Sequence, residues 1–156
     1  MKRRLLSGLV LLTVAPAFAA ESVPYPAGYR DWYHVKSMVI LPGHPLEKPF
    51  AGIHHVYAND AARRGLESGH FAPGAVLVFD LLEARQEGHA ITEGPRKLVG
   101  VMVRDPQHHA DTGGWGFEGF AGDSETRRLT RNGGRSCFEC HRQAEDHEYV
   151  FTRLRD

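Results

Sequence analysis

Ala75-Val76-Leu77-Val78-Phe79-Asp80-Leu81-Leu82-Glu83 is the stretch that decides the fold of this 156-residue chain. Apolar, β-branched and aromatic residues dominate it, and a proline and a glycine precede it, which predicts a β-strand over residues 75–83. Successive side chains of a strand point to opposite faces. We therefore expect Leu77, Phe79 and Leu81 to share one face of a sheet. Val76 and Val78 belong to the other face.

Further strand patterns extend on both sides of this segment. Residues 34–41 and 50–58 precede it, and residues 97–104 and the glycine-rich residues 113–122 follow it. Residues 86–96 are rich in turn formers and predict a connection between strands. Strands joined by turns predict a mainly β (α+β) domain built on an antiparallel sheet, and not a four-helix bundle.

A few short helices complete the predicted fold. Asn59 is suited to cap a helix over residues 60–68, which Gly69 would end. Residues 29–33 predict one helical turn. A last helix is expected to begin near the C-terminal cysteines and to run through His147.

Those cysteines form the motif Cys137-Phe138-Glu139-Cys140-His141, which fits the C-x-x-C-H attachment site of a c-type haem. Two thiols one helical turn apart can form thioether bonds with the two vinyl groups of one haem. His141 then lies below the iron as an axial ligand. The motif predicts one covalently bound haem c per chain, held by Cys137, Cys140 and His141.

Other uses of a lone C-x-x-C remain as alternatives to haem. An exported protein can use it as a disulfide or as a redox dithiol. A redox dithiol is expected to open a helix after a strand of a βαβ unit, whereas this motif lies near the C-terminus and is followed at once by histidine. A zinc site would need two further ligands, of which His147 could supply one.

The N-terminus predicts export. Residues 2–4 are basic, residues 5–15 are apolar, and residues 17–19 fit a small-residue cleavage site, which together indicate a signal peptide over residues 1–19. The apolar part is shorter than the roughly 20 residues that span a bilayer, although a retained anchor is the alternative. We expect a periplasmic bacterial protein with no membrane span after cleavage.

Residues 20–156, which follow the predicted signal peptide, are expected to form a single domain. Their 16 basic and 19 acidic groups give a formal charge of −3, with histidine neutral. Nucleic acid is not an expected partner, because contacts to phosphate need a basic surface.

The sixth coordination position of the iron decides the chemistry of such a protein. The candidates are two methionines and two histidine pairs: Met38, Met102, His54, His55, His108 and His109. Packing is the default role of both methionines, which lie in apolar strands. At most one of His54 and His55 faces a haem, because strand neighbours point to opposite faces. The second pair lies in a polar turn and is expected to be solvated or to form a weak metal site.

The chain resembles the cytochrome P-460 family, which includes the cytochromes c′-β. The matching pieces run in family order over nearly all of the predicted mature chain: residues 29–32, residues 52–57, Gly69-x-Phe71-x-x-Gly74, residues 113–117, residues 137–141 and residues 149–153. The resemblance implies a homodimeric, mainly antiparallel β protein with a pentacoordinate haem.

Two chemistries occur in that family. Cytochromes P-460 oxidise hydroxylamine and carry a lysine–haem cross-link, whereas cytochromes c′-β lack it and bind nitric oxide or carbon monoxide beside a phenylalanine-lined cap. The cross-linking lysine belongs in the family pattern G-x-V-x-V-K, at the position that Phe79 occupies here. From its pattern alone Phe79 is equally suited to the sheet core, but the resemblance favours a role in a cap over the haem. Phe50 is the second candidate for that cap.

A carboxylate just upstream of the haem motif is expected in members that oxidise hydroxylamine, as a proton acceptor. Residues 130–134 contain no Asp or Glu. Asp80, Glu118 and Asp123 remain as conceivable acids, with surface or turn roles as the default. Arg131 could polarise a bound ligand or be a solvated arginine of a turn.

Three functions follow from these observations. The first is a gas-binding mono-haem cytochrome that takes nitric oxide or carbon monoxide. The second is an oxidoreductase that oxidises hydroxylamine or nitric oxide. The third is a periplasmic electron-transfer cytochrome with a redox partner cytochrome. Phe79 favours the first.

Overall fold

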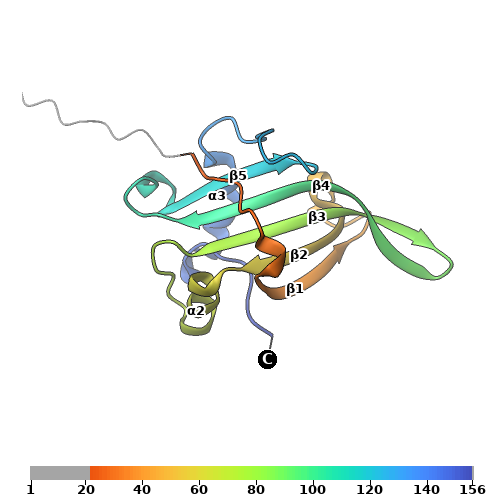
Figure 1. The fold of residues 1–156 in the computed structure, drawn as a ribbon, viewed down its shortest axis with the longest axis horizontal. Coiled ribbons are helices and arrows are strands. Elements are labelled where there is room, and N and C mark those ends of the chain that lie inside the picture. The colour runs from red at the N-terminus through yellow and green to blue at the C-terminus, as the bar shows by residue number, and fades with distance from the viewer. Residues whose placement is uncertain (1–21, 156) are drawn as a thin grey trace, which may run out of the picture.

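The computed structural model describes residues 22–155, so the predicted signal peptide lies outside the described residues. Five strands form one antiparallel sheet in the order β1-β2-β3-β4-β5 (Figure 1). They are β1 (Tyr33–Ile40), β2 (Gly52–Ala58), β3 (Val76–Glu87), β4 (Ala90–Arg104) and β5 (Trp115–Ala121). The predicted mainly β (α+β) class with an antiparallel sheet is confirmed.

The short helices lie around this sheet. They are η1 (Tyr29–Asp31), α1 (Glu47–Phe50), α2 (Asp60–Ser68), η2 (Ala110–Thr112), α3 (Arg135–His141) and η3 (Arg142–His147). Helix α2 has the predicted bounds and caps: the Asn59 side chain accepts a hydrogen bond from the Ala62 N–H, and Gly69 ends the helix with a left-handed backbone. None of the helices in the described part of the chain is long and apolar enough to cross a membrane.

The connection predicted over residues 86–96 is wrong. β3 and β4 continue through this region as a long hairpin that projects beyond the rest of the sheet (Figure 1). Gly94 and Pro95 looked like turn formers, but the pairing shifts register beside them, where Leu82 pairs with Arg96 and Ala84 with Glu93. Such a bulge accommodates a proline, which has no N–H for the ladder.

The two faces of the sheet are covered by different parts of the chain. Alternation along β3 is as predicted: Leu77 packs in one core and Val78 in the other. We call the face that bears Leu77 and Phe79 the α3 face, because α3 and the C-terminal segment pack there. The opposite face is the N-terminal face, because the segment of residues 23–32 crosses it (Figure 1).

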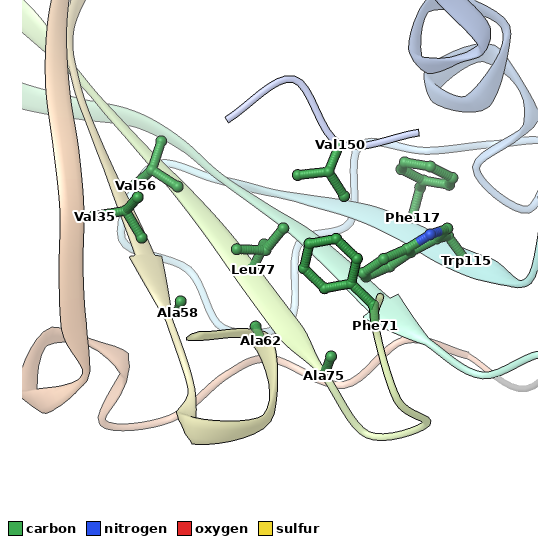
Figure 2. Close-up of a cluster of buried hydrophobic side chains, with 10 residues drawn as sticks. All are labelled: Val35, Val56, Ala58, Ala62, Phe71, Ala75, Leu77, Trp115, Phe117 and Val150. Atoms are coloured by element: carbon green, nitrogen blue, oxygen red, sulfur yellow. The ribbon is translucent and has the colours of Figure 1, made fainter. Parts of the chain in front are cut away.

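The main core lies on the α3 face. Figure 2 shows ten buried side chains: Val35, Val56, Ala58, Ala62, Phe71, Ala75, Leu77, Trp115, Phe117 and Val150. Val150 points from the C-terminal segment toward the sheet, and the ring of Phe71 stands edge-on to Trp115 at a centroid distance of 5.3 Å. This core fixes the C-terminal segment, and with it α3, on the sheet.

Candidate haem site

Helix α3 carries the cysteine motif and rests on strand β5. It begins after Gly134, whose φ of +78° suits glycine. A Cβ at Gly134 would lie 2.6 Å from the carbonyl oxygen of Phe117, so only glycine allows this approach. Cys137 and Cys140 follow in one helical turn as free thiols, the first half-buried and the second exposed. One haem edge can therefore meet both thiols.

Burial raises the pKa of the Cys137 thiol. A redox dithiol needs the reverse, a lowered pKa that supplies the attacking thiolate. The alternative of a redox dithiol is thus disfavoured by the surroundings of Cys137. Among residues 22–155, no group of three or more His, Cys, Asp or Glu side chains is arranged to hold a metal ion.

His141 presents one ring nitrogen for coordination. Its Nδ1 lies 2.8 Å from the carbonyl oxygen of Tyr149, which can only accept, so Nδ1 carries the proton and Nε2 keeps its lone pair. Burial lowers the pKa of His141, while the hydrogen bond to Tyr149 opposes this shift. The imidazole packs against Phe117 and Phe151 at centroid distances of 5.0 and 5.1 Å. Metal-bound histidines are oriented in this way by a backbone carbonyl.

The carbonyl of Tyr149 is held by a strained turn. Glu148 and Tyr149 have φ values of 52° and 66°, which non-glycine residues adopt rarely. Glu148 is fixed at both ends: its carbonyl accepts a hydrogen bond from Trp115 Nε1 at 2.9 Å, and its carboxylate accepts one from the Phe71 N–H at 3.1 Å. The turn follows directly after His147, where the predicted helical segment ends as α3 and then η3. Sequence reasoning missed Glu148, because its role rests on backbone conformation.

Phe79 and Phe50, the two candidates for the cap, contact each other on the α3 face. Their rings stand edge-on with centroids 5.7 Å apart. Phe79 is half-buried and packs against the main core. Lys97 fixes the loop that carries Phe50, because its Nζ donates to the carbonyls of Pro49 and Ala51 at 3.1 and 2.6 Å.

The two histidines of β2 point to opposite faces, as strand geometry requires. His54 lies on the α3 face, with its ring 4.5 Å from that of Phe79. Burial, followed by the charge of His55, lowers the pKa of His54 to about 4. His55 instead contacts Ser37 and Glu93. At most one of the pair was expected to face a haem, and His54 is the one on the α3 face.

The other candidates for a sixth ligand are two methionines and the second histidine pair. Met38 pairs with His54 in the sheet and is 45% exposed, and Met102 packs against the main core. His108 contacts Asp105, and His109 is buried against Gly116. The prediction that the second pair is solvated is therefore wrong for His109, because the turn folds back on β5.

Of the three conceivable acids, only Glu118 is near the cysteine motif, where its charge adds to the raised pKa of Cys137. Asp80 is buried on the N-terminal face, where it accepts hydrogen bonds from Tyr29 at 2.7 Å and Arg96 at 2.6 Å. Asp123 is ion-paired with the same arginine. Burial acts to raise the pKa of Glu118, but hydrogen bonds from Thr130, Gly119 and Arg128 lower it overall. These hydrogen bonds and ion pairs indicate a structural role for each of the three acids.

Arg131 is exposed. This fits the solvated turn arginine that we gave as one of its two possible roles.

These residues fit a haem. Two free thiols lie one helical turn apart, an oriented imidazole follows them, and apolar rings line the sheet face on which the helix packs. Residues 26–152 match the family model of cytochrome P460. The chain belongs to the cytochrome P460 family. It is therefore a haem-binding cytochrome, as the resemblance of its motifs indicated. A search of curated proteins found no significant match.

Proposed function

We propose that this cytochrome P460 family member is an exported mono-haem c-type cytochrome that binds nitric oxide or carbon monoxide. Cys137 and Cys140 hold the haem by thioether bonds, and His141 Nε2 coordinates the iron. When bound, the haem would supply an iron that can take a small ligand. The chain would supply the surroundings of that ligand, with Phe79 and Phe50 as its apolar cap.

The observation that carries this proposal is Phe79. It stands where the hydroxylamine-oxidising members are expected to carry their cross-linking lysine, and a phenyl ring cannot form that bond. Its edge-on contact with Phe50 makes an apolar surface on the same sheet face as the haem motif. Such a surface excludes water and charged ligands and admits small neutral diatomic molecules.

Export to the periplasm and assembly into a homodimer belong to the same proposal. The signal-peptide pattern of residues 1–19 supports export, and the family resemblance supports the dimer. Amino-terminal sequencing of the periplasmic fraction and light scattering of the purified holoprotein test the two statements separately.

The gas-binding test is a titration of the ferrous holoprotein with nitric oxide and with carbon monoxide, followed by optical absorption and resonance Raman spectroscopy. We expect a five-coordinate high-spin iron that gives new bands with each gas. A six-coordinate iron that binds neither gas would contradict the proposal. It would favour the electron carrier instead, with a side chain such as Met38 or Met102 in the sixth position.

Phe79→Leu and Phe120→Leu make a matched pair for the cap. The change is chemically the same, but Phe120 is buried in the core of the N-terminal face. We expect faster association of both gases in the first variant only. Equal rates in the two variants would remove Phe79 from the cap.

Hydroxylamine oxidation is the second candidate, and His54 is the observation that favours it. A neutral imidazole beside Phe79 can accept a proton, so the α3 face is less completely apolar than Phe79 and Phe50 suggest. This candidate predicts catalysed reduction of an external electron acceptor and a third covalent haem attachment. Peptide mapping by mass spectrometry that finds haem only on Cys137 and Cys140 would count against it.

A further inference from the structure

His54 has a buried nitrogen that the described residues leave without a partner. The side chain is 5% exposed, and its Nδ1 makes no hydrogen bond. Buried polar atoms in proteins are almost always hydrogen-bonded, and each exception needs an explanation. An apolar residue would fill this position between the strands without that cost. The imidazole therefore indicates a partner that is not part of the polypeptide.

His55 shows what a satisfied histidine looks like in the same strand. Its Nδ1 lies 2.6 Å from Ser37 Oγ, and its Nε2 lies 2.7 Å from Glu93 Oε1. Both ring nitrogens thus have partners on the N-terminal side of the sheet. The two neighbouring histidines differ in one respect that matters here: only His54 is on the α3 face.

The surroundings of His54 place it next to Phe79, the first residue of the proposed cap. Its ring contacts Phe79 at a centroid distance of 4.5 Å, and Phe79 in turn meets Phe50 edge-on. Its neighbours across the sheet are Met38 and Leu81, which bring no charge. A histidine in such surroundings stays neutral near pH 7, as its lowered pKa indicates. A neutral imidazole carries one N–H donor and one acceptor.

We infer that His54 is a ligand-binding residue that donates a hydrogen bond to the gas molecule on the open side of the haem. This inference rests on the proposed gas binding and adds a selectivity to it. A hydrogen-bond donor stabilises a bound ligand in proportion to the negative charge on that ligand. His54 therefore favours nitric oxide over carbon monoxide, a preference that Phe79 and Phe50 alone would not create.

The test compares the wild-type holoprotein with His54→Leu, His54→Gln and His55→Leu. The first readout is the C–O stretching frequency of the ferrous carbon monoxide complex, which a hydrogen bond to the ligand lowers. We expect a higher frequency in His54→Leu, a partial return in His54→Gln because the amide is a donor, and no change in His55→Leu. The last variant is the matched control, because it removes the neighbouring imidazole from the other face.

The second readout is the rate of ligand dissociation. We expect nitric oxide to leave His54→Leu about tenfold faster, which corresponds to about 1.4 kcal/mol. The rate for carbon monoxide changes by a smaller factor. Circular dichroism checks the fold, and His54→Phe serves as a second variant without a donor if His54→Leu does not fold.

Three results would overturn the inference. One is an unchanged C–O frequency and an unchanged dissociation rate in both variants without a donor. Another is a change of equal size in His55→Leu, because this would indicate an effect through the sheet. The third is a six-coordinate wild-type iron that becomes five-coordinate in His54→Leu, because His54 would then be the sixth ligand itself.

Failure of the proposed function is distinguishable from failure of this inference. If the ferrous protein binds neither gas, the proposed function fails, and cyanide on the ferric holoprotein becomes the probe for His54. Its C–N stretching frequency and dissociation rate should differ between the wild type and His54→Leu. If they do not differ, the inference fails as well.

Discussion

On the N-terminal face of the sheet, the buried carboxylate of Asp80 accepts hydrogen bonds from Tyr29 and Arg96, whereas on the α3 face the equally buried His54 has an unpaired Nδ1. In the described part of the chain, hydrogen bonds within the protein satisfy the buried side chains of the first face. The second face combines an imidazole that has one unpaired nitrogen with the oriented ring of His141 and two free thiols. The comparison indicates that the N-terminal face stabilises the fold and that the α3 face is completed by a cofactor.

Removal of both proposed haem anchors is the largest change that this comparison predicts. We expect the double variant Cys137→Ser and Cys140→Ser to lose all covalently attached haem, because no other cysteine exists in the sequence. Denaturing gel electrophoresis with a haem stain measures the loss. Asp80→Asn is the control from the other face and should retain full attachment. Haem that stays bound to the double variant after denaturation would show another covalent link.

Asp80→Ala tests the opposite face. Asp80 and Arg96 side chains are 2% and 9% exposed, so removal of Asp80 takes the buried partner from a buried arginine and leaves only the ion pair with the exposed Asp123. We expect a loss of about 3–5 kcal/mol in the free energy of unfolding, measured with guanidinium chloride on the holoprotein. The absorption spectrum of the folded variant should not change, because Asp80 lies on the face away from the haem. A shifted spectrum would contradict the division of roles between the faces.

The pH dependence of stability tests the unpaired histidine. His54 has a pKa of about 4 in the folded protein against 6.5 in the unfolded chain, so the unfolded state binds the proton first as the pH falls. The contribution of His54 to the free energy of unfolding is fully present above pH 6.5. It falls by about 3 kcal/mol in total as the pH is lowered from 6.5 to 4. The variant His54→Leu has no imidazole at this position and does not show this decrease. The measurement is the difference in unfolding free energy between wild type and variant across this range, which cancels the contribution of His141. A difference that does not depend on pH would mean that His54 is not held neutral by burial.

Much of the site was predictable from the sequence because its signals are local. The haem motif lies in five consecutive residues, and alternation along β3 assigns Leu77 and Val78 to opposite faces. The same rule separates His54 from His55. Such patterns depend on the geometry of a single helix or strand, and the structure reproduces them.

Other features depend on contacts between distant residues, which a single sequence does not reveal. Lys97 is 47 residues from Phe50 in the chain, yet its ammonium fixes the loop around that ring. Glu148 acts through a strained backbone turn that the helical pattern before it does not indicate. The prediction of a connection over residues 86–96 failed at Pro95 for a similar reason, since only the partner strand shows that a bulge accommodates this proline.

His55→Leu is the change with the smallest expected effect, and it sharpens the comparison between the faces. Its partner Glu93 has a side chain that is 55% exposed, so this ion pair lies in water and contributes less than about 1 kcal/mol. We therefore expect nearly unchanged stability and an unchanged haem spectrum. If this variant lost as much stability as His54→Leu gains at low pH, the two histidines would be coupled through the strand. The N-terminal face and the α3 face would then not have separate roles at β2, because a residue of one face would affect a residue of the other.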